Sequence, residues 1–177
     1  MPGRRQSATA RRNLLPRSVF RIPKEYLEVI PIGESLFSPL FQFENALRLG
    51  INKHMTTCYG SQWWEDSLKA ALPSVYEYAA EHQAKAALTS WIGASKRIPI
   101  LPIHHLTLGQ LEEIVKKYQS DCIPQLFQTM EFFLGHMECI KRVRNLYSHM
   151  FPGLQTRDRL TIKSEIRTMR LHLNTRL

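Results

Sequence analysis

The chain has 177 residues, which is enough for one domain with a substantial hydrophobic core and short for two. Its apolar fraction of 44% is that of a globular protein and excludes an intrinsically disordered chain. No apolar run approaches the roughly 20 residues that cross a bilayer, and no apolar segment follows the basic start. We therefore expect a soluble protein with no signal peptide and no membrane partner. The cysteines fit a reducing cytoplasm, because their number is odd and they are widely spaced: Cys58, Cys122 and Cys139.

The formal net charge of +9 is concentrated near the N-terminus. Residues 1–24 carry seven basic side chains and no acidic one. Three interpretations stay open: an arm that binds an acidic surface, most commonly nucleic acid; a solvated tail; or an organelle transit peptide. Prolines and weak periodicity extend to residue 35. We expect an irregular basic arm over residues 1–35 and a helical domain over residues 36–177.

The first long helix is expected over residues 36–58, because apolar residues recur there every three or four positions. Glu44 falls inside this apolar stripe, and Arg48, four residues on, is the nearest partner for the carboxylate. Gly60 is expected to end the helix. Trp63 and Trp64 either pack on the core or stack on bases, and packing is the commoner use of such a pair. The stripe consists of Leu40, Phe43, Leu47, Ile51, Met55 and Cys58.

Further helices are expected at residues 74–91 and from Thr107 to about Gln119, where T-L-G-Q matches a capping box. An apolar, proline-containing strap over residues 94–105 joins these two helices. The pattern breaks at residues 121–124, and a long helical tract then leads to Met150. A terminal helix is expected from about Thr156, with an apolar stripe of Ile162, Ile166, Met169 and Leu173.

Strand signals are weak throughout, so the sequence predicts an all-α protein. We expect an up-down bundle of four to five helices with a short terminal helix. The terminal helix has a basic face, which includes Arg167 and Arg170. This face is either solvated or extends a groove for RNA.

The stretch I-K-R-V-R-N-L-Y-S-H-M-F-P, residues 140–152, holds the most informative polar residues. On a helix that turns about 100° per residue, Arg144 falls inside the apolar arc, whereas Asn145 and His149 lie on the polar side. Arg144 either snorkels to solvent, pairs with a carboxylate such as Glu44, or serves function. Arg144 and His149 point roughly 140° apart on a straight helix. Either the helix end is distorted, or two copies of the motif face each other.

The chemistry of this set suits RNA cleavage. An arginine clamps a phosphate through two hydrogen bonds, and a histidine near a helix C-terminus can accept or donate a proton. Asn145 can orient His149 or the substrate. Attack of the 2′-OH on the adjacent phosphate needs a base, an acid and charge stabilisation, but no metal. His136 and Cys139, at i,i+3, are interpreted as core residues rather than metal ligands.

Residues Arg144–His149 match the R-N-x-x-x-H form of the R-x4-6-H motif of HEPN domains (higher eukaryotes and prokaryotes nucleotide-binding). The motif lies at the end of the penultimate helix, as in that family. The segment F-E-N-A-L-R, residues 43–48, resembles the first-helix E-x-x-x-R pattern of the abortive-infection-like branch. Tyr59-Gly60 with Trp63-Trp64, and residues 106–111, are also similar to that branch. The resemblance covers residues 36–177.

This resemblance implies an all-α bundle and a metal-independent endoribonuclease without a cofactor. Family members usually dimerise, so that two motifs form one composite cleft. Carried over, Arg144 and His149 are the catalytic pair and Asn145 supports them. Glu44 and Arg48 would give structural support, and we add Lys141, Arg142, Arg167 and Arg170 as candidate RNA-binding residues.

Many family members are toxins or defence proteins that cut RNA, so an antitoxin or regulatory partner is also implied. The alternative is a non-catalytic HEPN module that binds a partner protein or a nucleotide, with Arg144 and His149 serving structure.

Overall fold

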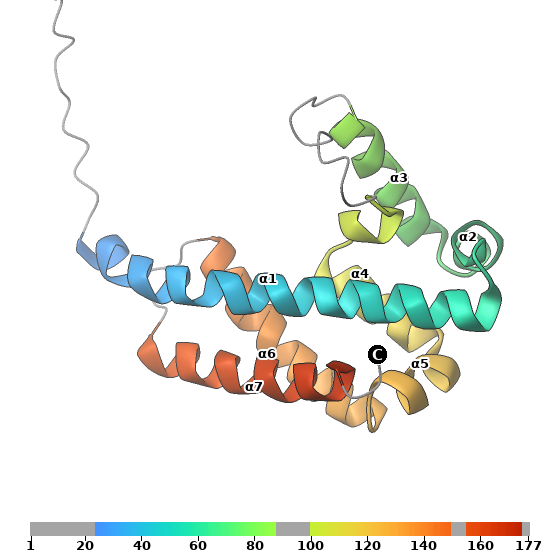
Figure 1. The fold of residues 1–177 in the computed structure, drawn as a ribbon. Helices are drawn as coiled ribbons and strands as arrows, with labels where there is room; N and C mark the ends of the chain where they lie inside the picture. Colours follow the sequence, from blue (N-terminus) through green and yellow to red (C-terminus); the bar gives the residue numbers. More distant parts are fainter. Residues whose placement is uncertain (1–23, 88–99, 150–154, 175–177) are drawn as a thin grey trace, which may run out of the picture.

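The computed structural model describes residues 24–87, 100–149 and 155–174, and within these ranges the chain forms helices and no strand (Figure 1). The expected all-α class is confirmed. The elements in chain order are α1 (Lys24–Tyr59), the π-helical turn η1 (Trp64–Leu68), α2 (Lys69–Ala71), α3 (Pro73–Ala87), the 3-10 turn η2 (Pro102–His105), α4 (Leu108–Lys117), α5 (Gln119–Leu126), α6 (Met130–Ser148) and α7 (Thr156–Asn174).

Helix α1 runs through the middle of the molecule, and α4, α5, α7 and η2 pack against it (Figure 1). On one side α6 and α7 pack against each other, and α7 runs beside α1 in the same direction. The chain reverses direction between α6 and α7, so these two consecutive helices pack side by side. On the other side α3 packs on η2, away from α7.

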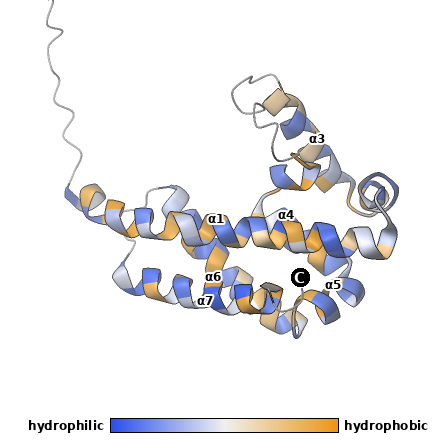
Figure 2. Cartoon of the chain, in the orientation of Figure 1, coloured by the Kyte–Doolittle hydropathy of each residue, from blue (hydrophilic) through white to orange (hydrophobic). Residues whose placement is uncertain are grey.

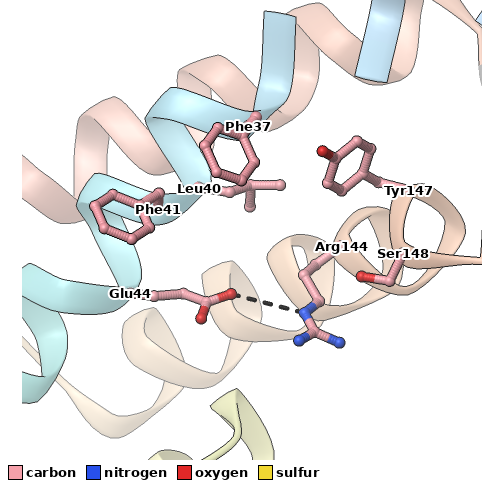
Figure 3. Close-up of a pocket in the computed structure, with 7 residues that line it drawn as sticks. All are labelled: Phe37, Leu40, Phe41, Glu44, Arg144, Tyr147 and Ser148. Atoms are coloured by element: carbon pink, nitrogen blue, oxygen red, sulfur yellow. Dashed lines mark ion pairs between the residues drawn. The ribbon is translucent and has the colours of Figure 1, made fainter. Parts of the chain in front are cut away.

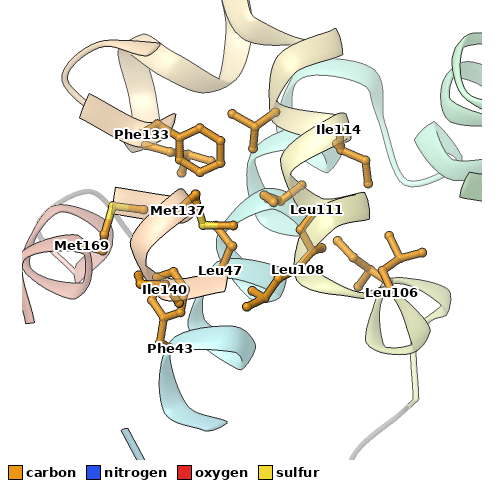
Figure 4. Packing of buried hydrophobic residues seen from close by; sticks show 14 of the residues in the cluster. Phe43, Leu47, Leu106, Leu108, Leu111, Ile114, Phe133, Met137, Ile140 and Met169 are labelled. Carbon is orange, nitrogen blue, oxygen red and sulfur yellow. The ribbon is translucent and has the colours of Figure 1, made fainter. Parts of the chain in front are cut away.

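The core lies where α1, α4, α6 and α7 meet, and Figure 4 shows its centre. Apolar residues alternate with polar ones along each helix, as Figure 2 shows for α1 and α7. The stripe expected on α7 is confirmed, because all four of its residues are buried. On α1 the stripe is confirmed from Leu40 to Met55 but wrong for Cys58, which is exposed beside the end of the helix.

Local signals read from the sequence also hold. The Thr107 hydroxyl accepts a hydrogen bond from the Gln110 N–H, and the Gln110 amide oxygen accepts one from the Thr107 N–H, as the capping box predicted. Gly60 has a φ of +84°, a value suited to glycine after a helix end. Trp63 and Trp64 are buried, so the packing interpretation is confirmed, and the Trp63 indole N–H donates to the Asn52 side chain at 3.2 Å.

The expectation of irregular structure up to residue 35 is wrong for residues 24–35, which form the first turns of α1. Pro31 and Pro39 lie inside this helix, although a proline removes one helical hydrogen bond. Burial of Val29 and Leu36 against the core offsets that loss. The boundary expected between residues 35 and 36 therefore falls within α1. The basic residues 1–23 lie outside the described residues.

Two other boundaries differ from expectation. The break predicted at residues 121–124 is helical in α5, where Cys122 and Leu126 are buried and Pro124 is tolerated. The terminal helix is not short, since α7 spans 19 residues, as many as α6. Its buried apolar residues extend from Ile162 to Leu173, so packing on the core stabilises the helix along most of its length. Of the expected strap, residues 94–99 lie outside the described residues and Pro102–His105 forms η2.

A close contact between α1 and the end of α6 positions the motif helix. Gly33 is buried beneath the Tyr147 ring, and a Cβ built on Gly33 would stand 2.8 Å from the ring carbon Cε2. Only glycine leaves room for this approach. The contact fixes the last turns of α6, which carry Arg144 and lead to His149, against the first half of α1.

We expect Gly33→Ala and Gly135→Ala to differ in the free energy of unfolding. Gly135 lies inside α6, and a Cβ there meets nothing within 4 Å, so alanine should stabilise the protein by about 0.5–1 kcal/mol. At Gly33 the ring of Tyr147 must shift, and overpacking of this kind costs about 1–3 kcal/mol. Urea denaturation measures both. Equal stabilisation by the two substitutions would contradict the contact.

Candidate functional site

The Glu44 carboxylate pairs with two arginines, Arg48 and Arg144, and Figure 3 shows the contact with Arg144. Its Oε2 accepts a hydrogen bond from Arg48 Nη2 at 3.1 Å, and its Oε1 lies 3.6 Å from Arg144 Nε. Arg48 is buried and also donates to the Leu106 carbonyl at 2.8 Å, which links α1 to the segment before α4. The Arg144 side chain is 39% exposed. The expected Glu44–Arg48 pair is thus confirmed, and Arg144 forms the ion pair considered for it, while its guanidinium stays accessible.

Glu112 on α4 bridges a second pair of cations in the same way. Lys116 Nζ lies 2.5 Å from Glu112 Oε1, and Lys141 Nζ lies 2.5 Å from Oε2. Burial by itself would raise the pKa of the Glu112 carboxyl, but the hydrogen bonds from Lys116 and Lys141 hold that pKa below its ordinary value. Lys141 precedes Arg144 by three residues on α6, so both cations point from the same face of the helix.

Two hollows flank Arg144. The first, called here the aromatic hollow, has a volume of about 170 Å³ and lies between α1 and the end of α6 (Figure 3). Its lining residues are Phe37, Leu40, Phe41, Glu44, Arg144, Tyr147 and Ser148. The second, called the basic hollow, has a volume of about 250 Å³ and lies between the start of α4 and α6. Its lining residues are Thr107, Leu108, Gly109, Lys141, Arg144 and Asn145.

His149 lies at the C-terminal cap of α6, where the helix ends with φ −95° and ψ 8°. Its N–H donates to the Asn145 carbonyl at 3.1 Å, and its side chain is exposed. It lines neither hollow. The structure brings Arg144 and Asn145 together in the basic hollow and places the His149 side chain outside both the basic and the aromatic hollow.

The candidate RNA-binding residues lie in different places. Lys141 lines the basic hollow, and Arg142 is exposed beside it on α6 without lining either hollow. Arg167 and Arg170 line a separate shallow depression between α7 and α1, and Arg170 Nη1 donates to the Gln42 side chain at 2.6 Å. The structure therefore divides these residues between two surfaces.

His136 and Cys139 are half-buried on α6 rather than fully buried core residues, and His136 makes a polar contact with another helix. His136 Nδ1 contacts the Glu165 carboxylate of α7, and burial raises the pKa of the Cys139 thiol. In residues 24–87, 100–149 and 155–174 no three His, Cys, Asp or Glu side chains are grouped to hold a metal ion.

Sequence reasoning missed Gly109, Glu112, Phe37 and Phe41 as neighbours of the motif. The capping box had marked the start of α4, and the i,i+3 spacing of Lys141 and Arg144 was visible. Nothing in the sequence, however, indicated that these two segments face each other.

No family model, curated protein or solved structure matches this chain. Among the helices that the structure describes, none is both long and apolar enough to span a membrane.

We expect the Glu112 bridge to contribute stability that disappears in acid. The folded-state pKa of Glu112 lies below its ordinary value, so this contribution is complete above that value and is lost as the pH falls through the lowered pKa. Glu112→Gln should cost about 2 kcal/mol at neutral pH. Denaturant titrations of wild type and variant from neutral pH into acid measure the difference. A gap that stays constant below pH 4.5 would contradict the bridge.

Proposed function

We propose that this protein is a metal-independent endoribonuclease of HEPN type that acts as a homodimer. The observation that carries the proposal is the state of Arg144. Its guanidinium is held by Glu44 and remains accessible between two hollows. A guanidinium held in this way is prepared to receive a phosphate oxygen, because little side-chain freedom is left to lose on binding.

The roles of the motif residues follow from their chemistry. Arg144 stabilises the negative charge that develops on the phosphate, and Asn145, in the same hollow, donates a hydrogen bond to the substrate. His149 transfers protons during attack of the 2′-OH and departure of the 5′-oxygen. Its exposed position at the end of α6 leaves its ring accessible to a substrate or a partner chain.

A dimer accounts for the separation of Arg144 from His149. A site made from one chain would need both side chains at one phosphate, but His149 lines neither hollow beside Arg144. With two facing copies of α6, the His149 of one protomer can reach the Arg144 of the other. A C2 interface suits such an arrangement, because each surface meets its own copy.

The resemblance to toxins and defence proteins leads to the biological part of the proposal. We infer that the protein cleaves RNA in the cytoplasm and that an antitoxin or another regulatory protein restrains it. No cofactor is required for this chemistry.

One observation favours a second function. The ion pair between Arg144 and Glu44 is also what a non-catalytic module would use to hold α6 against α1. In that case Arg144 and His149 serve the fold, and the protein binds a partner protein or nucleotide without cutting RNA.

We expect purified protein to cleave RNA in the presence of EDTA and to leave 2′,3′-cyclic phosphate ends. His149→Ala should lower the rate at least about 100-fold, because general acid–base catalysis contributes a factor of this size. The melting temperature should change little, since the side chain is exposed. Single-turnover cleavage with end mapping measures the first effect, and a thermal melt measures the second.

His54→Ala is the matched control, because it removes a histidine from α1 outside both hollows. It should cleave at the wild-type rate. Wild-type protein no more active than His149→Ala would contradict the ribonuclease, and a lower melting temperature for His149→Ala without any cleavage would favour the non-catalytic module.

A further inference from the structure

The basic hollow is positively charged despite its two neighbouring carboxylates. Glu44 pairs with Arg48 and Arg144, and Glu112 pairs with Lys116 and Lys141. Each carboxylate therefore bridges two cations, and the four cations and two carboxylates leave a net charge of +2. Arg144 and Lys141 are the members of these two groups that line the hollow. Both side chains are partly exposed, at 39% and 33%, so a ligand can reach them.

Hydrogen-bond donors dominate the rest of the lining. Asn145 offers a side-chain amide, and the first turn of α4 offers backbone N–H groups. The capping box uses the N–H groups of Thr107 and Gln110. Gly109 is the second residue of α4, and a backbone N–H in the first turn of a helix has no acceptor within the helix. Among the described residues that line the hollow, none carries a carboxylate.

The aromatic hollow lies on the other side of Arg144. The Phe37 and Phe41 rings are stacked with centroids 6.0 Å apart, and their residues are 58% and 60% exposed. Exposed phenylalanine rings form surfaces on which unpaired bases stack. Arg144 lines both hollows. A base stacked on the two rings and a phosphate in the basic hollow would therefore both lie next to Arg144.

We propose that the basic hollow binds a phosphate of single-stranded RNA while an adjacent base stacks on Phe37 and Phe41. The assignment of a phosphate follows from the charge and the donors. The assignment to RNA rests on the proposed ribonuclease function and on the exposed rings. Gly109 and Lys141 thereby become binding residues, in addition to Arg144 and Asn145.

Gly109→Asp tests the phosphate site without endangering the fold. A Cβ at Gly109 meets only the Thr107 hydroxyl oxygen, at 3.8 Å, and an acidic residue in the first turn of a helix favours the helix. The added carboxylate stands beside the hollow and should weaken binding of an anion at least about tenfold. Lys141→Ala removes one cation from the lining and should act in the same direction.

Two controls isolate the effect. Gly135→Asp adds the same charge to α6 where a side chain meets nothing within 4 Å. Lys117→Ala removes an exposed lysine at the far end of α4. Both should bind as the wild type does.

The probes are inorganic phosphate, followed by calorimetry, and a 2′-O-methyl RNA oligonucleotide, followed by fluorescence anisotropy at fixed salt. The modified RNA binds but cannot be cut, because its 2′-oxygen is blocked. Phe41→Leu should weaken RNA binding at least about fivefold and leave phosphate binding unchanged, because only the base loses its stacking surface.

The proposal is overturned if Gly109→Asp binds both probes as tightly as Gly135→Asp does. If Gly109→Asp weakens the binding of phosphate but leaves the binding of RNA unchanged, the assignment to RNA is overturned. An unchanged RNA affinity of Phe41→Leu would overturn the stacked base. Failure of the ribonuclease is a separate result, since RNA binding that requires Gly109 supports the hollow even if wild-type protein cuts no RNA.

Discussion

The carboxylate of Glu44 is the constraint on which the arrangement of the site depends. A carboxylate on the core-facing side of α1 needs compensating charge, and Arg48 and Arg144 supply it from two directions. Arg48 extends the link to the Leu106 carbonyl, just before α4 begins, and Arg144 extends it to α6. Three segments that are distant in sequence are therefore brought together at one acidic side chain, and the basic hollow is the space between two of them.

Much of the fold could be predicted because its causes are local. The apolar stripes of α1 and α7, the capping box at Thr107 and the Glu44–Arg48 pair all depend on residues within one or two turns of each other. The start of α1 was missed for a different reason. Pro31 disfavours a helix locally, but the burial of Leu36 and Val29 is a tertiary effect that outweighs it.

The candidate site was predictable only in part, for the same physical reason. Spacing on one helix placed Arg144 near an apolar face and turned His149 away from it. In the structure, His149 lines neither the basic nor the aromatic hollow beside Arg144. The bridge from Lys141 to Glu112 joins α6 to α4 through residues that are 29 positions apart in the sequence, as their numbers show, and no periodicity encodes it. The hollow formed by Gly109 and Lys141 is a product of that packing.

The central claim is that the end of α6 supplies half of a catalytic site. The most direct measurement mixes two inactive proteins, Arg144→Ala and His149→Ala, and assays RNA cleavage in EDTA. Each mixed dimer holds one intact Arg144 and one intact His149, on different protomers, so we expect activity to return in the mixture. A tag on each protein shows that mixed dimers have formed. Mixed dimers that form and remain as inactive as each variant alone would contradict the claim.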